Sequence, residues 1–406
     1  MHSKPYKVVY KVLYRLKIVQ KIKKFLKWFT YNKIYPLVYK RAAKKKVNNK
    51  KVVFIEVRQN YLTDNFQLLY DELKERGYKI EVFYLQNIAP NYIEFIKRCI
   101  NMMKLIGDAK YIFFNDACDV ISHVKIRKET VVTQTWHACG AFKKFGMGVA
   151  DKIFGANKET QLKYSGYTNL DYVTVSSPDI VWAYEMAMNL RPEDKIVRPV
   201  GVSRTDIFYD KDYIQSSYDK VYEVFPQAKG KKVVLYAPTF RGRVAKAKGP
   251  NRLDWTALYE NFGDEYVFLV KHHPFVKKLP KIPEEYADFA KDVTKELAIE
   301  TLLCASDICI SDYSSLVFEY SLFERPMIFF AYDLENYFDW RGFFYDYDTL
   351  TPGPVVSTTE EIIDYIKQYK EGFDPTEVRA FREKFMSACD GHATEKILDL
   401  VLNSKK

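Results

Sequence analysis

The sequence predicts an α/β protein made of two Rossmann-like, doubly wound domains that face a cleft. Short apolar runs rich in β-branched residues alternate with segments of helical periodicity, an order typical of parallel sheets with helices on both faces. The pattern stops at a linker around residues 206–230 and then starts again, which indicates two α/β halves. The length of 406 residues and the hydrophobic share of 48% are sufficient for two or three domains with substantial cores.

The first half begins with the run KVVFIEV at residues 51–57, which predicts a buried strand because it is short, apolar and β-branched. Apolar residues at steps of three and four predict a helix from Asp64 to Arg76, which Gly77 is expected to end. A second helix is predicted at about residues 91–105. The other strand-like runs of this half are residues 78–85, 111–116, 130–136, 171–177 and 195–201.

The second half repeats the alternation of strands and helices. Its strand-like runs are residues 231–240, 265–275, 306–315 and 325–333, and each ends in a polar or Gly/Pro turn. The last segment, about 376–404, is predicted to be helical and is a candidate to cross back to the first domain. The boundaries that follow are residues 1–50 for a basic leading segment, 51–205 and 206–385 for the two domains, and 386–406 for the C-terminal helix.

Positive charge is concentrated at the start of the chain. Residues 1–51 contain 17 of the 63 Lys and Arg residues and no Asp or Glu. The rest of the chain has 46 basic and 52 acidic residues, a net charge of −6, although the whole chain carries +11. A nucleic-acid-binding domain presents its basic residues across the binding surface. The distribution therefore argues against a nucleic-acid partner.

The basic segment also has a helical stripe of apolar residues, which predicts an amphipathic helix. No uncharged run of 18 residues exists, and lysines interrupt every candidate core of a secretory signal. One interpretation is a helix on an anionic inner leaflet, where each cation contributes about 1 kcal/mol; the other is a solvated helix packed on its own domain. We favour the first, with the protein peripheral at the cytoplasmic face of the membrane. The stripe consists of Val8, Val12, Leu16, Val19, Ile22, Leu26 and Phe29.

The run SDYSSLVFEY at residues 311–320 places hydroxyls and a carboxylate where a strand turns into a helix. Asp312, Ser314 and Ser315 lie at this turn, and Glu319 follows about one helical turn later. Serine hydroxyls and unpaired N–H groups at a helix start bind anions. The alternative is an ordinary helix cap.

Three other strand ends carry histidine or arginine. KHHPF, residues 271–275, has two adjacent histidines, of which at most one would face the cleft; both could instead be solvated or buried in the core. YAPTFRG, residues 236–242, contains Arg241, whose guanidinium suits phosphate oxygens. In SRTDIFY, residues 203–209, Arg204 and Asp206 are candidates for a structural ion pair or a helix cap.

The stretch TQTWHACGAFKKFG, residues 133–146, ends a further strand at His137. A loop of small residues follows it, and then Lys143 and Lys144. Together these strand ends suggest a phosphorylated donor. One histidine would act as general base for a hydroxyl nucleophile, while a second histidine, arginine and a helix start would stabilise phosphate charge. The sequence has no Walker A motif, no GxGxxG and no dedicated metal site, and we expect no cofactor.

The ordered set of motifs resembles the CDP-glycerol glycerophosphotransferase family of teichoic acid synthesis, whose members transfer glycerol or ribitol phosphate. The resemblance covers about residues 130–355. It rests on WHACGAFKKFG, GVSRTDIF, LYAPTFRG, KHHPF, SDYSSLVFEYSLFERPMIFF, DLENYFDWRGFFYD and TPGP.

The resemblance implies a GT-B fold, with an acceptor-side first domain and a donor-side second domain. It implies transfer of a polyol phosphate, with glycerol phosphate favoured, from a CDP-linked donor to a hydroxyl of a lipid-linked teichoic acid or capsule-type acceptor. CMP is released, and the basic segment would meet an anionic membrane surface. The oligomeric state stays open.

The resemblance also implies roles for single residues. His137 matches the proposed general base, and His273 matches the histidine near the donor pyrophosphate. Lys143 and Lys144 are expected to attract acceptor phosphates. The residues implied to meet the donor are Arg241, Asp312, Ser314, Ser315 and Glu319.

One departure concerns the loop after His137. Many members of the family read Trp-His-Gly, whereas this chain has Ala138 and delays its glycine to Gly140. We expect the small residues to leave room for an acceptor chain, and the departure leaves ribitol phosphate as the competing donor group. Two other hypotheses are a GT-B glycosyltransferase that uses a nucleotide sugar and a non-catalytic scaffold at the membrane surface.

Overall fold

The protein is described by a computed structural model, which covers residues 19–86, 91–152, 155–242, 246–335, 337 and 342–406. The chain forms two compact units. The first contains residues up to Trp136 together with 159–173 and 401–406. The second contains residues 137–158 and 174–400.

The first parallel sheet has the strand order β2-β1-β3-β4-β5-β6. Its strands are β1 (Asn48–Glu56), β2 (Lys79–Tyr84), β3 (Ala109–Phe114), β4 (Val131–Gln134), β5 (Tyr172–Thr174) and β6 (Val197–Arg198). The last six residues of β1 are all buried, as expected for a strand inside a parallel sheet. The strand order reverses between β1 and β3, which are direct neighbours.

The second parallel sheet has the order β12-β11-β10-β7-β8-β9. Its strands are β7 (Lys232–Tyr236), β8 (Tyr266–Val270), β9 (Ala290–Asp292), β10 (Ile308–Ser311), β11 (Met327–Phe330) and β12 (Val355–Val356). Counted from β7, this is the 3-2-1-4-5-6 order of a Rossmann sheet. The order reverses between the neighbours β7 and β10.

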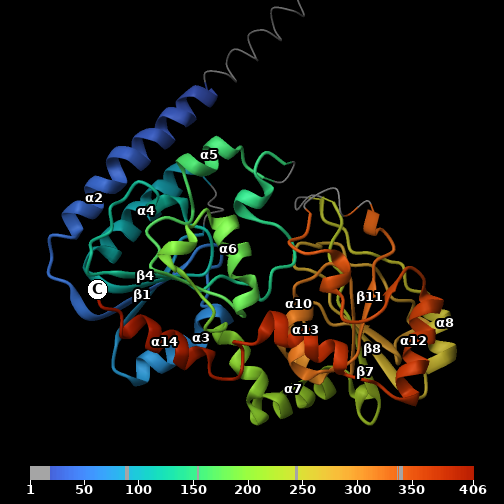
Figure 1. Cartoon of the computed structure of the whole chain (residues 1–406). Coiled ribbons are helices and arrows are strands. Elements are labelled where there is room, and N and C mark those ends of the chain that lie inside the picture. Colours follow the sequence, from blue (N-terminus) through green and yellow to red (C-terminus); the bar gives the residue numbers. More distant parts are fainter. Residues whose placement is uncertain (1–18, 87–90, 153–154, 243–245, 336, 338–341) are drawn as a thin grey trace, which may run out of the picture. The chain divides into compact units, whose positions relative to one another are not determined.

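Helices connect the strands and cover the sheets (Figure 1). Those of the first half are α2 (Tyr35–Ala42), α3 (Asp64–Glu75), α4 (Tyr92–Leu105), α5 (Lys158–Lys163) and α6 (Val181–Met188). Those of the second half are α7 (Lys211–Val224), α8 (Trp255–Phe262), α9 (Ile299–Ala305), α10 (Leu316–Tyr320), α12 (Thr359–Glu371), α13 (Thr376–Met386) and α14 (Ala393–Leu402). One large core of the second unit lies where α8 and α12 pack on alternate residues of β7, β8 and β10.

Most predicted elements are confirmed, including α3, which is followed by Gly77 at a φ of +71°. The structure differs from the predicted elements in three details. The expected linker at 206–230 contains the 14-residue helix α7, whose N-cap Asp210 accepts two backbone N–H groups. The short strands β9 and β12 were not predicted. The segment of about 376–404, predicted to be helical, forms two helices, α13 and α14, with Gly391 between them.

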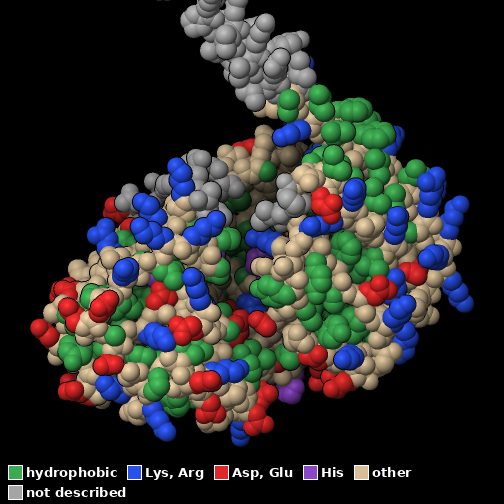
Figure 2. Space-filling view, turned by 180° about the vertical axis from the view of Figure 1, so that it is seen from behind, with side chains coloured by type: hydrophobic (Ala, Val, Ile, Leu, Met, Phe, Trp, Pro, Cys, Tyr) green, Lys and Arg blue, Asp and Glu red, His purple; other side chains and the backbone are tan. Residues whose placement is uncertain are grey.

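The basic segment is helical from residue 19 to Ala42, with one π-helical turn at Thr30–Ile34. Its first 18 residues, with Val8, Val12 and Leu16 of the predicted stripe, lie outside the described part of the chain. Figure 2 shows hydrophobic side chains gathered along this helix, with Lys and Arg side chains nearby. The exposed apolar residues are Val19, Ile22, Phe25, Leu26, Trp28, Phe29 and Leu37. None of the described helices has the length and apolar character needed to cross a bilayer.

Candidate active site

The strand ends singled out in the second half lie on one edge of the second sheet. The segments after β7, β8 and β10 carry Arg241, His273 and Asp312, respectively. In a parallel sheet all carboxyl ends lie at the same edge, and ligands bind where the strand order reverses. That reversal is the β7–β10 pair, so the structure brings these segments together as predicted.

Asp312 joins the ends of β7 and β10. It is buried, and its Oδ1 accepts the backbone N–H groups of Thr239 at 2.9 Å and Tyr313 at 2.7 Å. Its Oδ2 accepts the Thr239 hydroxyl at 3.0 Å and pairs with Arg241 at 2.9 Å. A carboxylate with this many internal donors stabilises the turn. Donor binding by Asp312 stays a prediction, and the geometry favours a positioning role.

Arg241 is also engaged by protein groups. Its Nε and Nη2 bind the two oxygens of Asp333 at 2.6 and 2.9 Å, and its Nη1 donates to Thr239. The guanidinium lies 5.2 Å from the ring centroids of Tyr313 and Tyr337. Burial would lower the pKa of Arg241, but the hydrogen bond to Asp333 and the charge of Asp312 raise it above its ordinary value. Arg241 stays a predicted phosphate clamp whose guanidinium, in this structure, braces the site.

The two serines after Asp312 are partly exposed. Ser314 Oγ accepts the Leu316 N–H at 3.4 Å. Ser315 is the N-cap residue of α10, and its side chain makes no capping hydrogen bond to that helix. A cap that leaves its hydroxyl off the helix loses a stabilising contact. Ser315 is therefore the serine better placed to meet a ligand oxygen.

The two histidines after β8 separate as predicted. His272 is buried, 3.9 Å from Asp292, and burial lowers its pKa while Asp292 opposes this. His273 is partly exposed, and its ring packs against Phe240 and Phe275 with centroids 5.0 and 4.5 Å away. Its Nδ1 accepts the Phe275 N–H at 3.2 Å. This places the proton of the neutral ring on Nε2, which can donate to a phosphate oxygen.

His137 follows a strained residue. Trp136 is buried and has a φ of +59°, although a bulky residue rarely adopts the left-handed region. Gln134 Oε1 accepts the Trp136 N–H at 3.0 Å and holds this turn. The side chain of His137 is exposed. Backbone strain of this kind costs about 1–3 kcal/mol and persists where a site requires a particular side-chain direction.

The small residues after His137 are used for packing, and room for an acceptor chain beside them stays a prediction. Cys139 and Ala141 are buried, and Gly140 has a φ of +61°. A Cβ at Gly140 would lie 2.4 Å from the ring of Phe318 in α10. The loop needs small residues because it packs closely on that helix. Its backbone is also held by Ser176, whose Oγ accepts the Gly140 N–H, and by Tyr184, which donates to the Gly140 carbonyl.

Arg204 and Glu319 connect this loop to α10. Arg204 Nε and Nη2 bind Glu319 Oε1 at 2.8 Å, and both side chains are buried. Arg204 Nη1 donates to the His137 carbonyl at 2.9 Å. Burial would lower the pKa of Arg204, and the charge of Glu319 raises it above its ordinary value. The structural ion pair expected of Arg204 is thus observed, and Glu319 stays a predicted donor contact that here positions the histidine loop.

The remaining sequence candidates have defined surroundings. Asp206 caps α14 by accepting the N–H groups of Ala393 and Thr394. Lys143 donates to the Tyr337 hydroxyl at 2.6 Å, and its ammonium lies over that ring. The Lys144 N–H donates to the Gly342 carbonyl at 3.0 Å. Acceptor binding by Lys143 and Lys144 stays a prediction.

Sequence reasoning assigned no role to several residues that hold the site, although Asp333 and Tyr337 lie in the motif DLENYFDWRGFFYD. Asp333 binds Arg241, and Tyr337 stacks on Tyr313 with centroids 3.8 Å apart. Ser176 and Tyr184 hold the loop after His137. These residues come from parts of the chain far from their partners, and only folding brings them together.

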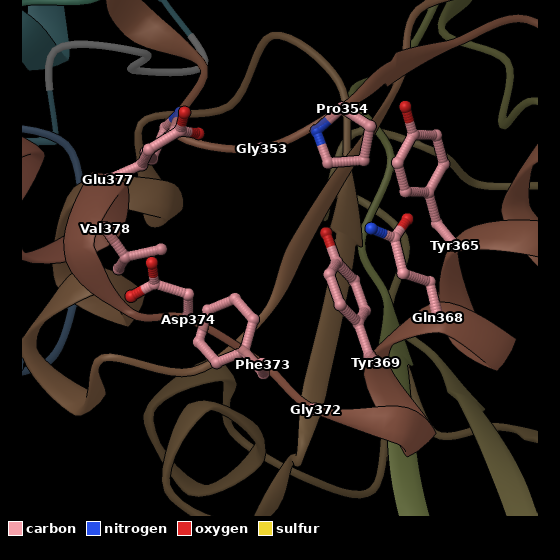
Figure 3. A pocket seen from close by; sticks show the side chains of 11 residues that line it. Gly353, Pro354, Tyr365, Gln368, Tyr369, Gly372, Phe373, Asp374, Glu377 and Val378 are labelled. Atoms are coloured by element: carbon pink, nitrogen blue, oxygen red, sulfur yellow. The ribbon is translucent and has the colours of Figure 1, made fainter.

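A cavity of about 440 Å³ lies at the other edge of the second sheet (Figure 3). Pro352, Gly353 and Pro354, which precede β12, form one side of it, and Tyr369 donates to the carbonyl of Met327, the first residue of β11. The TPGP motif thus belongs to the amino edge of the sheet. Among the described residues, no group of three or more His, Cys, Asp or Glu is arranged to hold a metal ion.

Residues 37–403 match the family described as CDP-Glycerol:Poly(glycerophosphate) glycerophosphotransferase, and the chain belongs to this family. It is 35% identical to a teichoic acid poly(ribitol-phosphate) polymerase of Bacillus spizizenii over 88% of this chain and 56% of that protein. It is 32% identical to a teichoic acid ribitol-phosphate primase of the same organism over 87% of this chain and 91% of that protein. The chain thus spans about half the length of the first relative and most of the second.

The fold is also similar to that of the wall teichoic acid polymerase TagF. The TM-score is 0.74 at 22% sequence identity, and the match covers 97% of each chain. At this identity the similarity concerns the fold alone. The predicted GT-B-like fold with two α/β sheets is confirmed.

Proposed function

We propose that this chain transfers a polyol phosphate from a CDP-linked donor to a hydroxyl of a lipid-linked teichoic acid or capsule-type acceptor. The observation that carries the proposal is the link between the predicted base and the donor edge. The exposed His137 belongs to a loop that Arg204 ties to α10, and α10 directly follows the predicted phosphate-binding turn at Ser314 and Ser315. Family membership over residues 37–403 supports the reaction class.

In the proposed reaction, the acceptor hydroxyl attacks the phosphorus that carries the polyol. His137 removes the hydroxyl proton, a new phosphodiester bond forms, and the pyrophosphate P–O bond breaks to release CMP. The Nε2–H of His273 and the hydroxyl of Ser315 would donate to the phosphate oxygens as charge develops on the leaving CMP. The protein would mainly position the reactants and stabilise charge, as in other phosphoryl transfers.

The relatives favour ribitol phosphate as the transferred group. The poly(ribitol-phosphate) polymerase and the ribitol-phosphate primase, at 35% and 32% identity over 88% and 87% of this chain, carry ribitol-phosphate names, whereas a glycerol-phosphate transferase of Staphylococcus aureus is 33% identical over the smaller share of 67%. The sequence alone favoured glycerol phosphate, with ribitol phosphate as the competitor. We therefore put CDP-ribitol first and CDP-glycerol second.

We further propose that the protein works at the cytoplasmic face of the membrane. The described helix of the basic segment exposes Phe25, Trp28 and Phe29 beside the exposed Lys21 and Lys24. Aromatic and cationic side chains on one helix suit the boundary between lipid headgroups and acyl chains. Lys21→Glu/Lys24→Glu should reduce co-sedimentation with phosphatidylglycerol vesicles, and equal binding by this variant and the wild type would contradict the proposal.

CMP release from CDP-ribitol and, in parallel, from CDP-glycerol tests the proposed reaction. A lipid-linked polyol-phosphate acceptor is supplied to the wild type and to His137→Ala. We expect acceptor-dependent CMP release from one donor and a loss of about 100- to 10,000-fold in the variant, the range for removing a general base. Because His137 is exposed, the thermal midpoint of the variant should match that of the wild type.

Two outcomes would contradict this reading. Transfer of a sugar from a nucleotide sugar, with no phosphodiester product, would select a GT-B glycosyltransferase. Full activity of His137→Ala, combined with loss of function on charge reversal in residues 1–51, would select a non-catalytic membrane scaffold.

A further inference from the structure

The carboxyl edge of the first sheet carries polar residues that the proposed reaction does not yet use. Glu56 ends β1, and Asn115 and Asp116 directly follow β3. The strand order reverses between these two strands, the place where an open parallel sheet binds ligands. Glu56 accepts the N–H and hydroxyl of Thr63 and the amide of Asn115 within 2.8 Å, and therefore serves the fold.

Arg58 differs from Glu56 because it is only partly engaged. It forms an ion pair with Asp116, whose side chain is 8% exposed, while 53% of the Arg58 side chain stays exposed. A buried carboxylate thus orients a guanidinium whose outer surface faces solvent. Arginine presents its donors in a planar fork that matches two oxygens of a phosphate.

One side chain connects this pair to the predicted base. Gln134 Nε2 donates to the Asp116 carbonyl at 2.9 Å, and Gln134 Oε1 accepts the Trp136 N–H at 3.0 Å. Trp136 directly precedes His137, and its ring packs against Tyr167 with centroids 6.0 Å apart. The Arg58–Asp116 pair is therefore two hydrogen bonds from the residue before His137.

We propose that Arg58, oriented by Asp116, binds the phosphodiester of the acceptor chain that lies next to its reacting hydroxyl. This inference rests on the proposed function. In a polyol-phosphate chain the terminal hydroxyl and the nearest phosphate are separated by a single polyol. Arg58 is linked through Asp116 and Gln134 to Trp136, whose next residue is the proposed base, so in this proposal it would meet that phosphate and select chains that already carry one polyol-phosphate unit.

Acceptor kinetics of the full chain in detergent micelles test the inference. The variants are Arg58→Ala, Arg58→Lys and Arg76→Ala. Arg76 is a matched control because it is another arginine of the first unit at the surface, paired with Glu72 at 2.8 Å. The acceptors are a synthetic lipid-linked chain with one polyol-phosphate unit and a lipid-linked analogue that ends in a hydroxyl without a phosphodiester.

For the phosphodiester acceptor we expect Arg58→Ala to raise the acceptor KM by about 10- to 100-fold, or about 1.4–2.8 kcal/mol. The donor KM and thermal midpoint should stay unchanged, and Arg58→Lys should recover part of the loss, since it keeps the charge but not the fork. Arg76→Ala should behave as the wild type. With the phosphate-free acceptor, Arg58→Ala and wild type should have the same KM.

An acceptor KM within twofold of wild type for Arg58→Ala would overturn the inference, as would an equal rise for both acceptors. Phospholipid headgroups are also phosphodiesters, so co-sedimentation with phosphatidylglycerol vesicles is the second arm. A loss of vesicle binding in Arg58→Ala would assign Arg58 to lipid and overturn the acceptor role. If the wild type releases no CMP from either donor, the proposed function itself has failed. If the wild type is active and Arg58→Ala behaves like it, only the inference about Arg58 has failed.

Discussion

In each sheet, a buried carboxylate joins the strand ends at the place where the strand order reverses. The two places differ in which neighbouring groups stay exposed. At the first, Glu56 binds the N–H and hydroxyl of Thr63 and joins the end of β1 to Asn115 after β3. At the second, Asp312 binds the N–H and hydroxyl of Thr239 and joins the end of β10 to that of β7. Both buried carboxylates hold neighbouring strand ends together.

The arginines beside these carboxylates make the difference. The side chain of Arg241 is 21% exposed and pairs with both Asp312 and Asp333, whereas that of Arg58 is 53% exposed and pairs with Asp116. The comparison teaches that residue type at a strand end does not define a role. The number of internal partners separates a residue that braces a site from one that can meet a ligand.

Replacing Asp312, the carboxylate that joins the ends of β7 and β10, should have the largest effect on stability. Asp312→Ala leaves Arg241 with one of its two carboxylates and the Thr239 N–H without its acceptor. Breaking a buried ion pair costs about 3–5 kcal/mol, and urea unfolding followed by tryptophan fluorescence would measure the loss. Arg58→Ala should cost less than about 1 kcal/mol because 53% of the Arg58 side chain is exposed. Equal losses of unfolding free energy in Asp312→Ala and Arg58→Ala would contradict the distinction between the two sites.

The Glu319–Arg204 pair should affect both stability and turnover. Glu319→Gln leaves the buried guanidinium without its counter-charge, so we expect a loss of about 1–3 kcal/mol and a lower kcat, since Arg204 holds the His137 carbonyl. Glu324→Gln is the matched control, because Glu324 pairs with the more exposed Arg379 and Arg382. If the two glutamine variants had the same kcat and unfolding free energy, the positioning role of Glu319 would be excluded.

Replacing Ser315 should weaken donor binding and leave stability almost unchanged. Ser315→Ala removes a hydroxyl that makes no capping bond to α10, so its unfolding free energy should stay within about 0.5 kcal/mol of wild type. Loss of one hydrogen bond to a charged group costs about 1.5–3 kcal/mol, which predicts a donor KM roughly 10- to 100-fold higher. An unchanged donor KM, measured by CMP release at saturating acceptor, would remove Ser315 from the donor site.

The smallest expected effect is the contribution of His272 to the pH dependence of stability. Burial lowers the pKa of His272 below its ordinary value near 6.5, so the unfolded chain binds this proton more readily than the folded chain. His272 therefore costs no stability above pH 6.5, and stability falls as the pH drops from 6.5 toward the folded pKa. His272→Gln should flatten this part of the curve by less than about 1.4 kcal/mol per pH unit. The exposed His392→Gln serves as control, and parallel curves for the wild type and His272→Gln would contradict the prediction.

The sequence predicted which residues lie at the carboxyl edge of each sheet more readily than it predicted the contacts that these residues make. The runs before Asp312, His273 and Arg241 read as strands because they are short, apolar and bounded by polar turns. Their common edge follows from parallel strands. The short strands β9 and β12 were missed because two or three residues carry too little periodicity to identify. Helix α7 lies within the segment predicted as a linker, and only Ser217 and Val221 of its 14 residues are buried.

By itself, the sequence determined the α/β class, the motif order and the positions of His137, His273 and Ser315 at strand ends, because these follow from local periodicity. Only the tertiary structure decided which charges brace the site. Arg204 and Glu319 are 115 residues apart, and Arg241 and Asp333 are 92 residues apart. A buried charge is stable only beside its partner, and folding alone selects that partner from the many opposite charges along the chain.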